Sequence, residues 1–271
     1  MEDEDEKLAA LVTAVTQSPK YRHITPDLIR QVGARELANR RTLKEAVKAT
    51  KNKLHQVGGA YRSRAIDFEQ ELAQLDGVLG EETAVREWCL GLMRRHASTQ
   101  ERLPILADFY GQTLTGLTDV RRVLDLACGL NPLARPWMPL SASVEYVASD
   151  IYADSVAFLG AFMAKVGLNG RVEVRDLITN PPVEQADLIL LLKTLPVLEQ
   201  IEKGAASRLL DVVNGRYLLI TFPVRSLGGR QKGMAQNYEA MFRGWVDGRD
   251  WHIRRFEFTA ELAFLVTTKI D

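Results

Sequence analysis

Residues 122–132 read Arg-Val-Leu-Asp-Leu-Ala-Cys-Gly-Leu-Asn-Pro, an apolar run that ends in small residues and is followed by a proline. This order predicts a buried strand over 122–128, a tight turn, and a helix that Asn131 caps and Pro132 begins. A second apolar run ends at Asp150. An α/β fold that holds a ribose-bearing cofactor uses such an arrangement. The stretch therefore favours an enzyme with a nucleotide-type α/β fold.

Short β-rich runs and helical or loop segments alternate after about residue 118. The runs cover residues 122–128, 144–151, 172–176, 187–192 and 217–222. Strands that alternate with helices predict a mainly parallel sheet that is covered on both faces. Two further runs, 251–258 and 262–269, follow each other closely. They predict an antiparallel hairpin at the edge of the sheet.

The first part of the chain has a different character. Residues 1–115 read as helices, with helix-start patterns at Thr25-Pro26-Asp27 and Thr42-Leu43-Lys44-Glu45. We therefore expect an N-terminal helical domain over residues 1–115, followed by an α/β domain over residues 116–271.

Small and acidic residues at the ends of the predicted strands indicate a bound nucleoside, because ligands bind beyond the carboxyl ends of parallel strands. We expect Ala127 and Gly129 to let a cofactor approach the backbone, and Asp150 to accept hydrogen bonds from two ribose hydroxyls. Asp176 and Leu177 are placed to contact an adenine. One glycine stands where the Gly-X-Gly-X-X-Gly dinucleotide fingerprint needs three, so a cofactor without phosphates fits better.

S-adenosylmethionine (SAM) is such a cofactor. The strand-end features together favour a class I SAM-dependent methyltransferase with a Rossmann-like sheet, although a strand-turn-helix without function would explain the first turn alone. Asn180-Pro181-Pro182 resembles the motif of adenine amino methylation but precedes the fourth strand, whose end carries Lys193 instead. Cys128 lies in the cofactor turn, which disfavours a covalent cysteine mechanism.

An atom with an available lone pair is then the expected methyl acceptor. Guanine N7 is one, and its methylation needs alignment with the methyl donor but no general base. In duplex RNA this atom faces a groove that side chains cannot easily enter, so the base would be flipped out. Phe222 could border such a base, and the cationic, glycine-rich loop 225–234 could grip phosphates; the alternative for the loop is an ordinary solvated surface.

A basic stretch supports RNA as the substrate. The chain has 35 basic and 35 acidic residues, yet residues 20–64 hold twelve Lys and Arg against three acids. Such clusters bind phosphates, although a charge run is often only a solvated helix face. Beside a methyltransferase domain we favour RNA contact, through Lys20, Arg40, Arg41, Lys44, Lys48 and Lys51.

Other classes of protein are disfavoured. Cys89 and Cys128 lie far apart and outside any metal-ligand pattern, so we expect neither a disulfide nor a metal site. No apolar stretch is long enough to span a bilayer, and the acidic start Met1–Glu6 is the opposite of a basic signal peptide. We therefore expect a cytoplasmic protein without a membrane partner.

Several blocks of sequence together resemble the aminoglycoside-resistance 16S ribosomal RNA methyltransferases, the Arm/Rmt group and their relatives in antibiotic producers. The resemblance extends over nearly the whole chain from about Tyr21. The blocks are His96-Ala97-Ser98-Thr99-Gln100-Glu101-Arg102, Asp125 to Pro132, Leu192-Lys193-Thr194-Leu195-Pro196, Phe222 to Arg230, Lys232-Gly233-Met234 and Glu261-Leu262. The acidic tip Glu2–Glu6 and the segment Asp67–Glu87 depart from the family pattern.

The resemblance implies methylation of guanine(1405) N7 in the decoding site of the assembled 30S subunit, which would block aminoglycosides. It also implies a set of residues around SAM: Tyr61, His96, Ala97, Ser98, Arg102, Ala127, Asp150, Asp176, Leu177 and Leu192. Arg102 would hold the methionine carboxylate in a bidentate fork, whereas His96 could instead be a core or capping residue. Lys193, Arg225, Arg230 and Lys232 would lie near the target nucleotide or its phosphates.

Two alternatives stay open. One is a SAM-dependent methyltransferase for another rRNA base, such as an adenine N1 in the decoding site. The other is a non-catalytic RNA-binding protein that keeps a relic of the cofactor fold.

Overall fold

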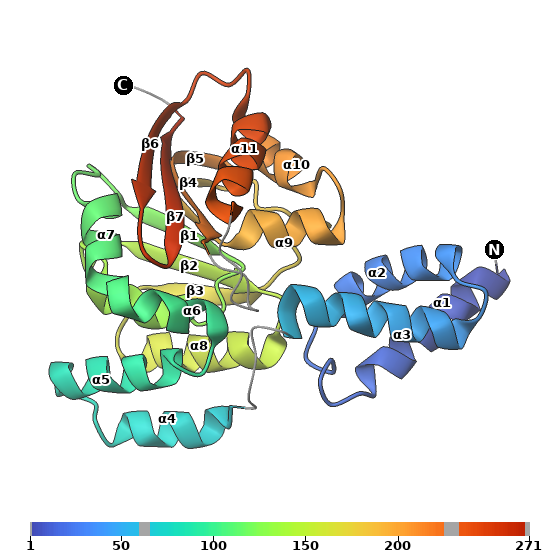
Figure 1. The fold of residues 1–271 in the computed structure, drawn as a ribbon. Helices are drawn as coiled ribbons and strands as arrows, with labels where there is room; N and C mark the ends of the chain where they lie inside the picture. The colour runs from blue at the N-terminus through green and yellow to red at the C-terminus, as the bar shows by residue number, and fades with distance from the viewer. Residues whose placement is uncertain (1, 60–65, 225–232, 269–271) are drawn as a thin grey trace.

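The computed structural model describes residues 2–59, 66–224 and 233–268 (Figure 1). Its centre is a seven-stranded sheet with the order β3-β2-β1-β4-β5-β7-β6. The strands are β1 (Arg122–Leu126), β2 (Glu145–Asp150), β3 (Gly170–Val174), β4 (Gln185–Leu192), β5 (Asn214–Pro223), β6 (His252–Glu257) and β7 (Glu261–Thr267). The first five pair in parallel, and β7 pairs antiparallel with both β5 and β6. The predicted parallel sheet with a closing hairpin at one edge is confirmed.

Helices cover both faces of the sheet, because the apolar side chains of each central strand alternate between two cores. Leu188 and Leu190 of β4 face the first core, and Ile189 and Leu191 face the second. The helices of the first core are α4 (Phe68–Asp76), α5 (Glu82–Met93), α7 (Leu106–Leu114) and α8 (Ala153–Lys165), with η3 (Asn131–Trp137). Those of the second are α9 (Thr194–Ile201), α10 (Ala205–Val212) and α11 (Met234–Val246). Figure 1 shows the two layers on either side of the strands.

The N-terminal lobe, residues 2–59, has a core of its own, to which Tyr152 after β2 also contributes. It consists of α1 (Glu2–Thr16), α2 (Pro26–Asn39), α3 (Leu43–Leu54) and the π-helical turn η1 (His55–Gly59), and it projects from the sheet layers (Figure 1). The expected helix starts are present, since the Thr25 hydroxyl accepts from the N–H of Leu28 and that of Thr42 from the N–H of Glu45.

The boundary between the two cores lies at a different position from the expected domain boundary near residue 115. Helices α4 to α7, including the short α6 (Ala97–Arg102) and η2 (Leu103–Ile105), follow the lobe in sequence. Leu75 of α4, Cys89 of α5 and Phe109 of α7 are buried in the same core as the sheet. The packing therefore divides after residue 59, because the apolar faces of these later helices are buried against the strands.

The lobe is attached beside the end of β2. Ile24 forms an isolated antiparallel bridge with Tyr152. The N–H of Thr25 donates to the carbonyl of Ile151 at 3.0 Å, and the N–H of Ala153 donates to that of His23 at 2.8 Å. The lobe thus lies next to the carboxyl edge of the sheet, where a ligand is expected.

Candidate cofactor and target-base site

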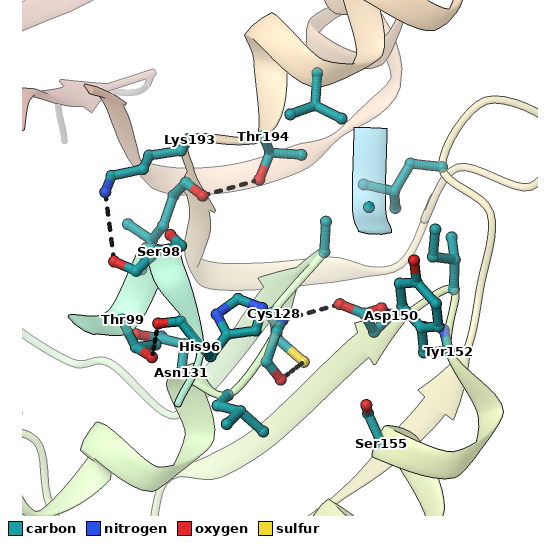
Figure 2. Close-up of a pocket in the computed structure, with 18 of the residues that line it drawn as sticks. His96, Ser98, Thr99, Cys128, Asn131, Asp150, Tyr152, Ser155, Lys193 and Thr194 are labelled. Atoms are coloured by element: carbon teal, nitrogen blue, oxygen red, sulfur yellow. Dashed lines mark hydrogen bonds between the residues drawn. The ribbon is translucent and has the colours of Figure 1, made fainter. Parts of the chain in front are cut away.

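A pocket opens at the carboxyl ends of β1, β2 and β4, where the order of the strands reverses (Figure 2). This is the expected place for a ligand in an open parallel sheet. Most of the predicted cofactor residues line it: His96, Ser98, Arg102, Ala127, Gly129, Asp150, Asp176, Leu177 and Leu192. Ala97 is not among the lining residues, although its neighbours are. Tyr61 lies outside the described residues.

The turn after β1 brings the backbone to the pocket wall. Ala127 and Gly129 both have φ of 54°, in the left-handed region that side chains disfavour. A Cβ built on Gly129 would lie 2.8 Å from Cε1 of His96. The His96 ring therefore fills the space that a side chain at this position would need; that the turn also lets a cofactor approach the backbone stays a prediction. The N–H of Gly129 donates to Oδ2 of Asp150 at 2.8 Å.

The acidic residues Asp150 and Asp176 at the strand ends are held by hydrogen bonds from backbone N–H groups and, for Asp176, also from a hydroxyl. Oδ1 of Asp150 accepts from the N–H of Tyr152 at 3.2 Å, which with Gly129 fixes the orientation of the carboxylate. Asp176 accepts from the N–H of Ile178 and the hydroxyl of Thr179, both at 3.0 Å. Burial raises the pKa of Asp176 despite these hydrogen bonds. Both carboxyl groups are buried in the pocket wall.

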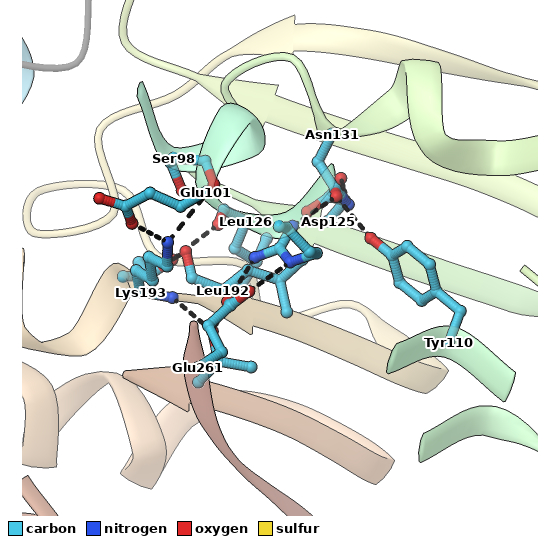
Figure 3. A network of polar contacts seen from close by, with 12 residues as sticks. Ser98, Glu101, Tyr110, Asp125, Leu126, Asn131, Leu192, Lys193 and Glu261 are labelled. Carbon is cyan, nitrogen blue, oxygen red and sulfur yellow. Dashed lines mark hydrogen bonds and ion pairs between the residues drawn. The ribbon is translucent and has the colours of Figure 1, made fainter. Parts of the chain in front are cut away.

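A buried polar network lies beneath the turn (Figure 3). Arg102 donates from Nε and Nη2 to the two carboxylate oxygens of Glu261, each at 2.6 Å, and from Nη1 to Oδ1 of Asn131 at 3.0 Å. The amide of Asn131 donates to Oδ2 of Asp125 at 2.9 Å, and the hydroxyl of Tyr146 donates to the same oxygen at 2.7 Å. The network ties α6, β1, η3 and β7 together.

Two predictions about this region are corrected. Asn131 does not cap an α-helix, because η3 is a 3₁₀ helix without a side-chain cap and the Asn131 side chain points into the network. The bidentate fork of Arg102 binds Glu261, whereas the sequence interpretation gave that fork to a methionine carboxylate. A ligand in the pocket therefore meets an Arg102 that is already neutralised and oriented.

The pKa values of Asp125 and Glu261, the two acids of this network, are shifted in opposite directions. Burial raises the pKa of Asp125 to about 6, although hydrogen bonds from Tyr146 and Asn131 oppose it. Burial alone would raise the pKa of Glu261 too, but the charges of Arg102 and Lys193, with the hydrogen bonds from Arg102 and Thr221, outweigh it and hold the pKa below its usual value. Glu261 is therefore the carboxylate that balances Arg102.

Lys193 lies at the end of β4, where the sequence predicted a residue near the target base. Its backbone is left-handed, with φ of 59°, and its side chain is buried and lines the pocket. The ammonium donates to the carbonyl of Ser98 at 3.3 Å and to Oε2 of Glu101 at 2.5 Å. Arg225, Arg230 and Lys232, expected nearby, lie outside the described residues.

Phe222 does not border the pocket, so its predicted contact with the target base is wrong. The residue is fully buried in the second core. Its ring stacks on Tyr238 and Trp245 of α11 and meets Phe264 of β7 edge-on. The side chain points to the sheet face that α11 covers, which places it in the core rather than at the substrate.

The basic residues of the N-terminal lobe are mostly at the surface. Lys20, Arg40, Arg41, Lys44 and Lys48 are exposed and Lys51 is half-buried. Asn39, Arg40, Arg41, Glu45, Lys48, Ala49 and Asn52 line a shallow hollow between α2 and α3. Within residues 2–59, 66–224 and 233–268, no helix is long and apolar enough to cross a membrane, and no cluster of metal-ligating side chains is found.

Sequence reasoning missed several lining residues. Thr194, whose hydroxyl donates to the carbonyl of Leu126 at 3.1 Å, directly follows Lys193 and could have been read from the same strand end. Val197, Leu198 and Ile201 of α9 form an apolar wall. They resemble ordinary core positions in sequence, so only the packing of α9 identifies them.

Comparisons with known proteins agree with this geometry. A family model described as "Ribosomal RNA methyltransferase (FmrO)" matches residues 17–265. The chain is 39% identical to a 16S rRNA (guanine(1405)-N(7))-methyltransferase of Micromonospora rosea, with 97% of each chain covered. It is 35% identical to the enzyme of the same name from Serratia marcescens, covering 86% of this chain and 87% of that one.

Solved structures are similar as well. The 16S rRNA methyltransferase RmtF in complex with S-adenosyl-L-homocysteine superposes with a TM-score of 0.83 at 33% identity, covering 97% of this chain and 99% of that one. The 16S rRNA methylase RmtB gives a TM-score of 0.79 at 28% identity, covering 97% and 98%. These two structures therefore match this chain in sequence and in fold over almost its full length.

Proposed function

The chain belongs to the ribosomal RNA methyltransferase (FmrO) family, and from that premise we propose that it methylates N7 of guanine(1405) in the 16S rRNA of the 30S subunit, with SAM as the methyl donor. The observation that carries the proposal is the pocket at the ends of β1, β2 and β4, whose acids and glycine turn suit a nucleoside without phosphates. The expected consequence is resistance to aminoglycosides that contact this base.

The residues of the pocket fit SAM. Asp150, fixed by two backbone N–H groups, is placed for the ribose hydroxyls, and Asp176 with Leu177 for the adenine. At Gly129 the backbone and the His96 ring lie too close together for a Cβ, so this wall of the pocket is formed by backbone and the His96 ring. When bound, SAM supplies a methyl group on a positively charged sulfur. We retain Tyr61, His96, Ala97, Ser98 and Leu192 as cofactor residues.

Arg102 keeps a narrower cofactor role. Its guanidinium has five N–H donors, and three bind Glu261 and Asn131. A remaining N–H of Nη1 or Nη2 can donate to the methionine carboxylate, but a bidentate clamp would require Glu261 to leave. Arg102 thus orients the cofactor through one hydrogen bond and supports the turn through the others.

The reaction places few chemical demands on the protein. Guanine N7 carries no proton and has a lone pair, so the residues must align it with the methyl group and exclude water rather than remove a proton. Lys193 and Thr194 follow β4 at the pocket wall and are placed to border the incoming base. No side chain is required to act as a general base.

The N-terminal lobe is the proposed docking surface for the 30S subunit. Its exposed cations are Lys20, Arg40, Arg41, Lys44 and Lys48, joined by the half-buried Lys51, and Arg230 and Lys232 are proposed to contact rRNA near the target. Clustered cations bind phosphates with an affinity that falls steeply with salt. Since the substrate is an assembled ribosomal subunit, we place the protein in the cytoplasm.

Mapping the modified nucleotide tests the proposal. Purified 30S subunits are incubated with the protein and SAM, and N7-methylguanine is located by reduction and aniline cleavage followed by primer extension. Cleavage at guanine(1405) is expected, with gentamicin and kanamycin resistance but no apramycin resistance in a susceptible host. Modification of an adenine, or activity on naked RNA alone, would contradict the choice of target. Absence of SAM binding by calorimetry would instead favour a non-catalytic RNA-binding protein.

A further inference from the structure

We propose that Lys193 and Glu101 together recognise the O6 and N1–H groups of the target guanine, and so discriminate it from adenine. The inference rests on the proposed function, because it takes the substrate to be a guanine presented at N7. It assigns to Glu101 a role as a specificity-determining residue.

The backbone of Lys193 is held in one conformation. Its φ of 59° is rare for a residue with a side chain. Its N–H donates to the carbonyl oxygen of Thr221 at 3.1 Å and to the Thr221 hydroxyl at 3.0 Å. That hydroxyl in turn donates to Oε1 of Glu261 at 2.8 Å. The strained strand end therefore rests on the buried Arg102 and Glu261 pair, and it directs the Lys193 side chain along the pocket wall towards α6.

The ammonium of Lys193 keeps a donor for a ligand. The side chain is only 4% exposed, and lysines are almost never so buried unless paired. An ammonium has three N–H donors. Among the described residues its hydrogen-bond partners are the carbonyl of Ser98 and Oε2 of Glu101 (Figures 2 and 3). One N–H is therefore left at the pocket wall.

Glu101 supplies an acceptor beside that donor. It lies on α6 next to Arg102, and its side chain is 33% exposed. Oε2 accepts from Lys193, and Oε1 accepts no hydrogen bond within the part of the chain that the structure describes. A donor and an acceptor are thus adjacent where β4 and α6 meet; Lys193 lines the pocket, and Glu101 lies beside it, outside the lining residues.

This pair matches one base edge. Guanine presents the O6 acceptor beside the N1–H donor, so the ammonium can donate to O6 while the carboxylate accepts from N1–H. N7 lies on the other side of O6 and stays without a hydrogen bond, which leaves its lone pair for methylation. Adenine presents the reverse, an amino group and a bare N1. It would place like groups opposite each other at both positions, which is an effective means of discrimination.

Base analogues at the target position provide the test. 30S subunits are reconstituted with 16S rRNA that carries guanine, inosine or 2-aminopurine there. Inosine keeps O6, N1–H and N7, whereas 2-aminopurine keeps N7 but lacks O6 and N1–H. The wild-type protein is expected to methylate inosine nearly as fast as guanine and 2-aminopurine at least about tenfold more slowly, since an unsatisfied recognition site rejects an analogue strongly.

Variants assign the discrimination to the pair. Glu101→Gln and Lys193→Met are expected to lower kcat on guanine subunits at least about tenfold and to bring the ratio of guanine to 2-aminopurine rates close to one. Their SAM affinity and 30S affinity are expected to stay within about threefold of wild type, and Glu101→Asp should restore part of the discrimination. Gln100→Ala, at an exposed position on the same helix, is the matched control and should keep the wild-type ratio.

The outcomes separate the inference from the proposed function. If wild type and control methylate guanine(1405) but both variants keep the wild-type ratio, or if inosine is as poor as 2-aminopurine, the pair does not recognise the base. If the variants lose stability and SAM binding together, their role is structural and the inference is overturned. If the wild-type protein does not methylate 30S subunits at all, the proposed function itself fails.

Discussion

The guanidinium of Arg102 and the carboxylate of Glu261 form a doubly hydrogen-bonded pair, with both N–O distances 2.6 Å and the side chains 2% and 0% exposed. A strand of the closing hairpin thereby neutralises a cation on a helix that precedes the first strand. Removing only one partner of such a pair destabilises the fold, because the other charge is left buried without a counter-charge.

Arg102→Met is therefore expected to lower the free energy of unfolding by about 3–5 kcal/mol, measured by urea denaturation. The double variant Arg102→Met with Glu261→Leu should recover much of that loss, because no buried charge remains. SAM titration of the double variant then reports the cofactor role of Arg102 apart from its structural one. Equal stability of the single and double variants would contradict the pairing argument.

The raised pKa of Asp125 predicts that the stability of the protein depends on pH. Burial raises its pKa to about 6, above about 3.9 for an unfolded aspartate. Its contribution to stability is therefore fully present below pH 4 and is lost as the pH rises through 6. Asp125→Asn should gain about 2–3 kcal/mol relative to wild type between pH 4 and pH 7.5, measured by urea unfolding at each pH. A relative stability that does not change between these pH values would contradict the raised pKa.

Gly129→Ala tests the turn at the cofactor. The added Cβ would meet the His96 ring at 2.8 Å and would take a left-handed φ, so SAM affinity should fall at least about tenfold by calorimetry. Gly116→Ala carries the same kind of backbone penalty, with φ of 89°, but its Cβ meets no atom within 4 Å. Wild-type SAM affinity is expected for this control. Equal losses in both variants would show backbone strain rather than contact with His96.

Removing exposed lysines of the N-terminal lobe is expected to change the salt dependence of 30S binding. Lys44→Ala with Lys48→Ala should weaken 30S binding and reduce the slope of log affinity against log salt by about two, because each lysine that contacts a phosphate releases about one counterion. SAM affinity should not change. Arg121→Ala, at an exposed position at the amino end of β1, is the control. An unchanged slope would show that these lysines are only a solvated helix face.

Variants of Phe222 test the assignment of its side chain to the core rather than to the target base. Because the ring is buried against α11 and β7, Phe222→Ala should cost about 3–5 kcal/mol of stability. Phe222→Leu should cost less and keep the methylation rate per folded molecule. A stable Phe222→Leu protein that binds SAM and 30S subunits yet fails to methylate would restore a role at the base.

The sheet could be predicted from the sequence because each strand is a short apolar run that is separated from the next by a helical or loop segment. The strand ends also located Asp150, Asp176 and Lys193 at the pocket, since parallel strands bring their carboxyl ends together. Helices α4 to α7 could not be assigned to the sheet layers, because an amphipathic helix has the same pattern whatever it packs against. The sequence does not reveal that Arg102 pairs with Glu261, because the two residues are 159 positions apart.

The attachment of the lobe beside β2 predicts that two binding equilibria are linked. Leu28 of α2 and Gly58 of η1 belong to the wall of the cofactor pocket, while the exposed lysines of the same lobe are proposed to contact rRNA. We therefore expect a shift of the lobe on the ribosomal subunit to change the pocket, and cofactor binding to act on the lobe in return. Thermodynamic reciprocity requires both effects to have the same coupling free energy, so the factor by which SAM alters 30S affinity must equal the factor by which 30S subunits alter SAM affinity.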